Sequence, residues 1–170
     1  MVPAVIVVMG VSGSGKTTVA AELARRLHCD FAEGDDFHPE ANVAKMRAGI
    51  PLDDHDRGPW LDAIAAWIAQ ARGSGRRCVV ACSALKRAYR RRLAAGRDDV
   101  RFVYLQGEYE LIAGRLARRR GHYMPPALLR SQFDALEEPG SDENPLVVPV
   151  DAPPDSIVAT IAARLESVSG

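Results

Sequence analysis

The segment Gly10–Thr17 constrains the fold of this chain more than any other feature. It reads Gly-Val-Ser-Gly-Ser-Gly-Lys-Thr and matches the phosphate-binding pattern G-x-x-x-x-G-K-[ST] at every defined position. An apolar run, Val5–Met9, precedes it, and a segment with helical periodicity follows it. In that context the glycines can turn successive N–H groups towards an anion, and the helix N-terminus adds partial positive charge. The alternative is a plain glycine-rich turn, but the context favours a loop that binds a nucleoside triphosphate.

The residues of this loop have separate expected roles. Lys16 is expected to reach the β- and γ-phosphates of the nucleotide, and the Thr17 hydroxyl is expected to ligate Mg²⁺. The nucleotide-binding residues predicted within this segment form one continuous run: Gly10, Val11, Ser12, Gly13, Ser14, Gly15, Lys16, Thr17 and Thr18.

Short apolar runs alternate with helical periodicity along the whole chain. Strands are expected at Val5–Met9, Phe31–Glu33, Cys78–Cys82, Phe102–Leu105 and Leu146–Val150. Helices are expected after the loop, over Glu40–Ala48, from a first turn containing Pro59, and over Lys86–Ala95, Leu111–Arg119, Leu128–Leu136 and Ile157–Val168. The alternation predicts an α/β three-layer fold with a mostly parallel sheet covered on both faces. Because ligands of such sheets bind beyond the carboxyl ends of the strands, the residues after each strand are candidates for function.

Composition and charge narrow the class of protein. The chain has 170 residues, enough for one domain, and its formal net charge of +0 gives no global attraction to nucleic acid or to an anionic membrane. No apolar stretch approaches the roughly 20 residues of a membrane span. The three cysteines, Cys29, Cys78 and Cys82, have no C-x-x-C spacing and are expected to be buried reduced thiols. We therefore expect one soluble cytoplasmic domain over residues 1–170, without a nucleic-acid or membrane partner.

Three carboxylates follow the second expected strand. Glu33, Asp35 and Asp36 lie within four residues of one another, and their mutual repulsion is costly unless a cation or a bound hydroxyl lies among them. The alternative is an acidic surface turn. The strands Cys78–Cys82 and Phe102–Leu105 end without the aspartate that usually supports Mg²⁺ in phosphate-loop enzymes. Glu33 or Asp35 is therefore a candidate for that support.

Charged residues also surround the start of the next helix and follow the third strand. The acids between Asp53 and Asp56 can cap the helix that contains Pro59, and Arg57 either neutralises them or presents its guanidinium to an anionic substrate. Lys86 lies close enough to a strand end to face a ligand. The arginines that follow it are expected to form a solvated helix face, since the net charge does not support a nucleic-acid stripe.

A second group of arginines lies at the end of a predicted helix. Arg115, Arg118, Arg119 and Arg120 precede a proline-bounded loop that contains His122. Arginines near a phosphate loop can stabilise the charge of a transferring phosphoryl group, and a closing lid would exclude water. The helix dipole alone would also favour basic residues here.

Four further motifs give the chain a specific resemblance. They are Gly-Asp-Asp-Phe-His-Pro, Pro-Leu-Asp-Asp-His-Asp-Arg-Gly-Pro-Trp-Leu, Cys-Ser-Ala-Leu-Lys and Ser-Gln-Phe-Asp-Ala-Leu-Glu-Glu-Pro. With the phosphate loop, and in this order from Val5 to about Val150, they resemble the bacterial gluconokinases, which are nucleoside-monophosphate-kinase-like enzymes related to shikimate kinase. The resemblance implies ATP- and Mg²⁺-dependent phosphorylation of D-gluconate on its terminal hydroxyl, as part of gluconate utilisation. It also implies a five-stranded parallel sheet, a substrate-binding segment at about 40–60, a lid at about 119–130 and a homodimer.

The resemblance assigns roles to individual residues. Glu33 is expected to support Mg²⁺, although many gluconokinases have aspartate there, and Asp35 to orient the reacting hydroxyl. Arg57 is expected to bind the substrate carboxylate, with His38, Lys86 and His122 among the other substrate-binding residues. Arg115 matches an arginine that stacks on adenine, and Arg119 one that contacts phosphate. Lys16, Mg²⁺ and Arg119 would then stabilise the transferring phosphoryl group.

Two alternatives remain at this level. A kinase for another small hydroxy acid, such as shikimate, would share the loop and much of the site. A nucleotide-dependent RNA-binding module would use the arginines after Lys86 and after Arg115, but it leaves the acids at 33–36 without a role.

Overall fold

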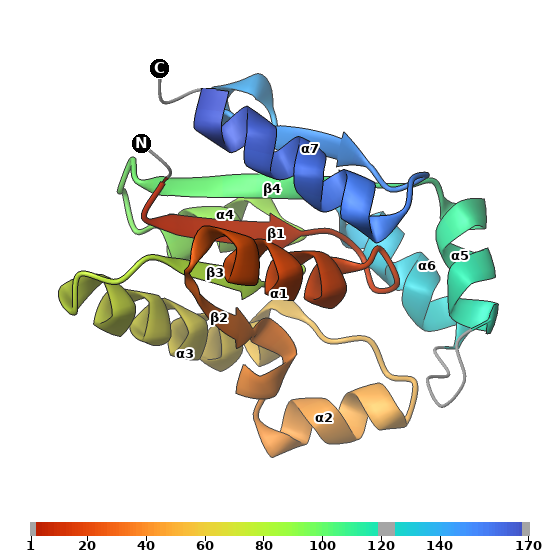
Figure 1. The fold of residues 1–170 in the computed structure, drawn as a ribbon. Coiled ribbons are helices and arrows are strands. Elements are labelled where there is room, and N and C mark those ends of the chain that lie inside the picture. Colours follow the sequence, from red (N-terminus) through yellow and green to blue (C-terminus); the bar gives the residue numbers. More distant parts are fainter. Residues whose placement is uncertain (1–2, 119–124, 168–170) are drawn as a thin grey trace.

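A five-stranded parallel sheet organises the chain (Figure 1). The computed structural model describes residues 3–118 and 125–167. The strands are β1 (Val5–Met9), β2 (Asp30–Glu33), β3 (Cys78–Ala81), β4 (Val100–Gln106) and β5 (Leu146–Pro149), in the order β2-β3-β1-β4-β5. Every neighbouring pair is parallel. The three-layer parallel fold expected from the alternation of strands and helices is confirmed.

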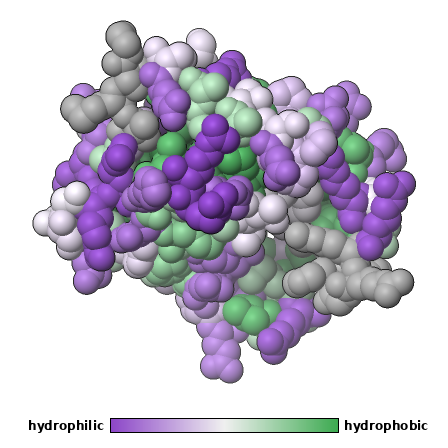
Figure 2. Space-filling view, in the orientation of Figure 1, coloured by the Kyte–Doolittle hydropathy of each residue, from purple (hydrophilic) through white to green (hydrophobic). Residues whose placement is uncertain are grey.

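Helices connect the strands and cover both faces of the sheet. They are α1 (Lys16–Leu27), α2 (Glu40–Arg47), α3 (Asp54–Gly73), α4 (Arg87–Ala94), α5 (Tyr109–Arg118), α6 (Pro126–Ala135) and α7 (Pro154–Ser167), with short 3₁₀ turns η1 (Gly34–Phe37) and η2 (Ser141–Glu143). Figure 1 shows α1 and α7 across one face of the sheet and α3 and α4 behind it. Figure 2, in the same orientation, shows hydrophilic side chains on the face that carries α1 and α7, with hydrophobic surface between them.

The central strand β1 contributes to both halves of the core. Successive strand side chains point to opposite faces, so Ile6 and Val8 pack with α1 and α7, whereas Val5, Val7 and Met9 pack with α3 and α4. All five side chains are fully buried. A strand that is covered on both faces needs an uninterrupted apolar run, which is what marks Val5–Met9 in the sequence.

Two glycines allow the turns that bring the functional segments together. Gly15 precedes α1 with φ +95°, a backbone conformation that favours glycine, and space is open around the position of its missing Cβ. Gly34 lies so close to β3 that an added Cβ would be 2.3 Å from the carbonyl oxygen of Ala81. This approach fixes the start of η1, and with it the acids on either side, at the carboxyl end of the sheet.

Two sequence-based expectations about α3 and α4 are wrong. Pro59 is not in the first turn of its helix, because α3 begins at Asp54, where Asp53 and Asp56 form a capping box. The arginines of α4 do not all form a solvated face, because Arg90 is 1% exposed and its guanidinium bonds to neighbouring segments. Val168, expected on the closing helix, lies outside the described residues.

Two further expectations concern the state of the cysteines and membrane-spanning helices. All three cysteines are free thiols; Cys78 and Cys82 are buried and Cys29 is half-buried. Burial raises the pKa of the Cys82 thiol to about 12, which keeps it protonated and unreactive at neutral pH. Within residues 3–118 and 125–167, no helix combines the length and the apolar character that crossing a membrane requires.

Candidate active site

The phosphate-binding loop forms part of the walls of two cavities at the carboxyl edge of the sheet. One has a volume of about 590 Å³ and lies between the loop, α5 and the start of α7. The other has a volume of about 310 Å³ and lies between the loop, η1, α3 and α6. Gly13, Ser14, Gly15 and Thr18 line the larger cavity, whereas Ser12 and Lys16 line the smaller one. The loop therefore separates the two sides of one potential reaction centre.

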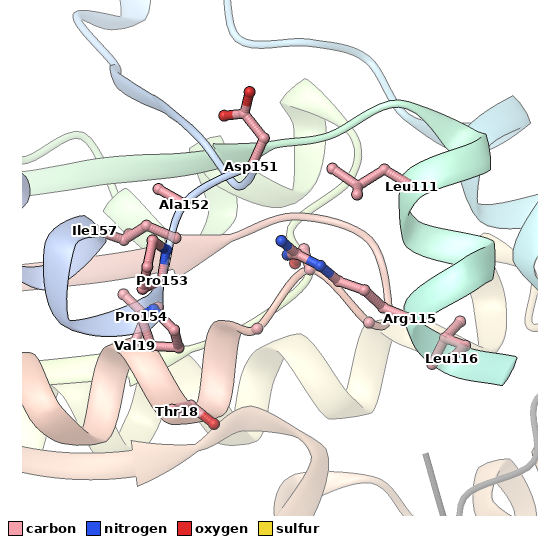
Figure 3. Close-up of a pocket in the computed structure, with 13 residues that line it drawn as sticks. Thr18, Val19, Leu111, Arg115, Leu116, Asp151, Ala152, Pro153, Pro154 and Ile157 are labelled. Carbon is pink, nitrogen blue, oxygen red and sulfur yellow. The ribbon is translucent and has the colours of Figure 1, made fainter. Parts of the chain in front are cut away.

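The larger cavity has the features of a nucleotide site (Figure 3). Its walls include Leu111 and Leu116 from α5 and, on the other side, Pro153, Pro154 and Ile157. In Figure 3 the Arg115 side chain extends from α5 into the space between these walls. Its guanidinium donates a hydrogen bond to the carbonyl oxygen of Val150. Apolar walls with one planar cation suit a flat aromatic base.

The loop itself provides a cradle for phosphate. The Ser14 hydroxyl is buried and makes no hydrogen bond within the described residues, so a polar ligand would satisfy it. Gly13, with φ +83°, and Gly15 allow the tight turn that a phosphate-binding loop requires, and α1 starts directly behind them. The Lys16 ammonium donates to the carbonyl oxygen of Val11 at 3.0 Å, which folds the side chain along the loop. The residues present thus fit a triphosphate.

Thr17 and Glu33 meet beside the loop. The Thr17 hydroxyl donates to the Glu33 carboxylate, whose other oxygen accepts from the Asp35 N–H at 3.2 Å. No group of three or more metal-binding His, Cys, Asp or Glu side chains gathers within the described ranges. Mg²⁺ in phosphate-loop enzymes needs no such group, because it takes one or two protein oxygens, substrate phosphates and water. The Thr17–Glu33 pair fits that chemistry.

The smaller cavity brings together most of the predicted acceptor-side residues. Asp35, His38 and Arg57 all line it, together with Lys16 from the phosphate-binding loop. Asp36, the other candidate for contact with a hydroxyl, is an exposed residue of η1. The other lining residues are Ser12, Val43, Met46, Arg47, Leu52, Trp60, Ser83, Leu85, Pro125, Leu128, Ser131 and Gln132. A carboxylate, cationic groups and several hydroxyls in one small cavity suit a polar, anionic ligand.

His38 is held rigidly in this wall. Its ring stacks on Trp60 with centroids 4.3 Å apart, and the Trp60 indole N–H donates to the carbonyl oxygen of Gly34 at 2.7 Å. The Asn42 amide nitrogen lies 3.2 Å from Nδ1 of His38, and Asp35 lies 4.0 Å from Nε2. Burial lowers the pKa of His38, and the nearby Asp35 carboxylate only partly opposes this. The imidazole is therefore neutral at pH 7.

Arg57 is anchored from the neighbouring helix α4. Its guanidinium donates to the Tyr89 hydroxyl at 3.2 Å, and that hydroxyl donates in turn to Asp54. Among the described residues, no acid forms an ion pair with Arg57, although several acids are close in sequence. Of the two interpretations of Arg57, this arrangement favours a guanidinium presented to an anion over one that neutralises its neighbours.

Other predicted residues lie elsewhere. The Lys86 ammonium bonds to Asp54 at 2.9 Å and is absent from the described lining of the acceptor cavity, so its predicted substrate contact stays a prediction. Arg119 and His122 lie outside the described residues. Gln132 and Arg47 line the acceptor cavity although sequence reasoning gave them no role. The position of Gln132 in the Ser-Gln-Phe motif could have identified it as a candidate. No local sequence pattern distinguishes Arg47.

Fold and loop together define the class of protein: the chain is a P-loop kinase that acts on a small molecule. A family model described as an AAA domain matches residues 5–139. The shikimate kinase of Aquifex aeolicus has the same fold, with a TM-score of 0.63 at 18% identity over 97% of this chain and 98% of that one.

Two gluconokinases are more similar to this chain in sequence than the shikimate kinase is. The thermoresistant gluconokinase of Escherichia coli is 43% identical over 92% of this chain and 90% of its own length. The structure of a gluconokinase from Sinorhizobium meliloti superposes with a TM-score of 0.89 at 43% identity, over 98% of this chain and 93% of that one. The chain belongs to the gluconokinase family.

Proposed function

We propose that this chain transfers the γ-phosphoryl group of ATP to the terminal hydroxyl of D-gluconate, giving 6-phosphogluconate and ADP. Family membership supports the reaction. The observation that carries it is that Asp35 and Arg57 line one cavity together with Lys16 of the phosphate loop. A hydroxy acid needs a cation for its carboxylate and an acceptor for its reacting hydroxyl, and this cavity offers both beside the expected position of the phosphates.

The residues divide the work of an in-line transfer. Arg57 binds the gluconate carboxylate, and Asp35 orients the terminal hydroxyl. As the hydroxyl oxygen forms its bond to phosphorus, the bond from phosphorus to the β–γ bridging oxygen breaks and its electron pair stays on ADP. The hydroxyl proton passes to Asp35 and then to solvent. Lys16 offsets the charge on the transferring group, so that positioning and charge stabilisation supply most of the rate.

The nucleotide and the metal have their own set of residues. The loop, from Gly10 to Thr18, holds the phosphates, and Arg115 packs on the base. Thr17 and Glu33 would hold Mg²⁺, which would supply positive charge beside the phosphates when bound. Arg119 would contact the same phosphates. His38, Lys86 and His122 would complete the acceptor side.

The proposal also covers the organisation of the molecule. Residues 1–170 act as one kinase domain in the cytoplasm, with a substrate-binding segment at about 40–60 and a lid at about 119–130. The active species is a homodimer, which light scattering of the purified chain would test.

ADP release measured across a panel of acceptors tests the reaction. D-Gluconate is expected to stimulate turnover. D-Glucose and shikimate are expected to stimulate it less, because D-glucose lacks the carboxylate and shikimate lacks the extended chain. The similarity to the shikimate kinase structure, at 18% identity, shows the fold alone. Equal rates with gluconate and shikimate would contradict the proposal.

Lys16→Ala serves as the control for this panel. It is expected to fold, because Lys16 is half-buried at the surface of the loop, and to lose gluconate-dependent ADP release by orders of magnitude. Equal activity in the parent and the Lys16→Ala variant would assign the turnover to a contaminating kinase and would remove the support for the proposal.

A further inference from the structure

The side chain of Gln132 on α6 makes a two-point contact with Ser12 of the phosphate loop. Its carbonyl oxygen accepts a hydrogen bond from the Ser12 backbone N–H at 2.7 Å, and its amide nitrogen donates to the Ser12 hydroxyl at 2.9 Å. The two residues are 120 positions apart in the sequence. The side-chain amide has an acceptor and a donor side by side, so it can bind the Ser12 N–H and the Ser12 hydroxyl at the same time.

This contact separates Ser12 from the rest of the phosphate cradle. The Ser12 N–H points at Gln132, whereas Gly13, Ser14 and Gly15 face the nucleotide cavity. Ser12 and Gln132 both line the acceptor cavity, together with Lys16 and Asp35. Gln132 therefore lies on the acceptor side of the loop, where the two substrates must approach each other.

Glu137, two residues beyond the end of α6, is fixed to a second wall of the same cavity. The Glu137 N–H donates to the carbonyl oxygen of Leu85 at 2.7 Å, and the Arg87 N–H donates to the Glu137 carboxylate at 2.8 Å. Buried Arg90 donates to the Glu137 carbonyl oxygen at 2.9 Å. Ser83 and Leu85, in the segment that receives these bonds, line the acceptor cavity. The helix thus spans from the loop that holds the donor to the wall that holds the acceptor.

From this arrangement we infer that Gln132 is a positioning residue that sets the acceptor cavity in register with the phosphate loop. It acts through Ser12 and α6, and not by contact with the reacting atoms. The inference rests on the proposed function. Its chemical consequence is specific: without the amide, ATP and gluconate each still bind, but the hydroxyl and the γ-phosphorus are less well aligned.

Loss of the Gln132 side chain is expected to lower kcat without changing the KM for ATP by much. A misplacement of about 1 Å can cost on the order of 100-fold in rate, so Gln132→Ala is expected to lower kcat by roughly 10- to 100-fold. The KM for ATP should stay within about threefold of the parent value, because the contacts at Gly13–Thr17 remain. Asp134→Asn, on the exposed side of the same helix, is the matched control and should keep the parent kcat.

Ser12→Ala and the double variant distinguish positioning from a general loss of stability. Ser12→Ala removes the bond to the hydroxyl and keeps the bond to the backbone, so its loss in kcat should be smaller than that of Gln132→Ala. Since both residues act through one contact, the double variant should lose no more than Gln132→Ala alone. Multiplied losses in the double variant would overturn the inference.

Thermal unfolding of every variant and turnover of the parent complete the experiment. A parent chain without gluconate-dependent ADP release refutes the proposed function. A parent that turns over gluconate, together with a folded Gln132→Ala variant of equal kcat, refutes the role of Gln132 alone. If Gln132→Ala does not fold, Ser12→Ala decides: a reduced kcat at unchanged melting temperature supports positioning, and the parent kcat overturns it.

Discussion

The Arg57 guanidinium lies 3.2 Å from the Tyr89 hydroxyl, and this contact joins a residue of the acceptor cavity to helix α4. The guanidinium carbon is 5.6 Å from the centre of the same ring, so the phenol limits both the direction and the distance of the arginine. Behind Tyr89, its hydroxyl and the Lys86 ammonium share the Asp54 carboxylate. These bonds lower the pKa of Asp54, which keeps it ionised as the acceptor for both groups. Tyr89 therefore orients Arg57 without needing to touch the substrate.

Tyr89→Phe should consequently raise the KM for gluconate with little change in the KM for ATP. The variant keeps the ring and its packing but removes a hydrogen bond worth about 1 kcal/mol, which corresponds to roughly a fivefold change in affinity. Steady-state kinetics with each substrate varied in turn measures the two constants. Tyr109→Phe is the matched control, because Tyr109 packs against Phe133 and Arg130, away from Arg57. Equal changes in both KM values for Tyr89→Phe would refute the orienting role.

Replacement of Arg57 itself should have a larger effect on the same constant. A charge-assisted hydrogen bond contributes about 1.5–3 kcal/mol, so Arg57→Ala should raise the gluconate KM by roughly 10- to 100-fold. Arg47 lines the same cavity from the end of α2 but is exposed, and it offers a direct comparison. Arg47→Ala is expected to change the gluconate KM less than Arg57→Ala. The reverse order would assign carboxylate binding to Arg47.

The sequence predicts those parts of the fold and site that depend on local pattern. The buried run Val5–Met9, the loop after it and the helix behind the loop can be read directly, since strand burial, glycine conformation and helix start are all encoded within a few residues. The acids at 33–36 could also be placed, because the carboxyl ends of parallel strands meet at one edge.

Contacts between distant segments could not be predicted in the same way. The partners of Arg90 are Ala84, Glu137 and Glu143, and no periodicity in α4 distinguishes this arginine from its exposed neighbours. Gln132 likewise depends on a loop residue 120 positions away. The error over Pro59 has a local cause: proline is common in a first turn, but the capping box of Asp53 and Asp56 starts α3 earlier.

The buried Arg90 makes a prediction about stability. Its guanidinium bonds to the Glu143 carboxylate at 2.7 Å and to two backbone carbonyl oxygens, so Arg90→Ala takes the buried cation away from a half-buried acid and from both carbonyl oxygens. Breaking such a buried pair costs about 3–5 kcal/mol. Urea unfolding should show a lower midpoint at unchanged slope, whereas Arg91→Ala, on the exposed side of α4, should leave the midpoint near that of the parent. A small change for Arg90→Ala would mean that water replaces its partners.

His38 gives a prediction about pH. The Asn42 amide nitrogen can only donate, so Nδ1 of His38 must accept and the ring proton belongs on Nε2, towards Asp35. Protonation at Nδ1 would break that bond within a wall where the His38 side chain is 4% exposed. Burial lowers the pKa of His38 below 6.5, the Asp35 carboxylate opposes the shift, and the Arg57 guanidinium adds to it.

The sign of the effect on stability follows from that shift. Below pH 6.5 the unfolded chain binds a proton that folded His38 does not yet accept, so the free energy of unfolding should fall as the pH falls through this range. NMR titration of the imidazole should show a midpoint below 6.5, with the neutral ring protonated on Nε2. Asp35→Asn removes a carboxylate that favours the charged ring, so it should lower the midpoint further. A midpoint above 6.5 in the parent, or an upward shift in Asp35→Asn, would contradict this account of the acceptor cavity.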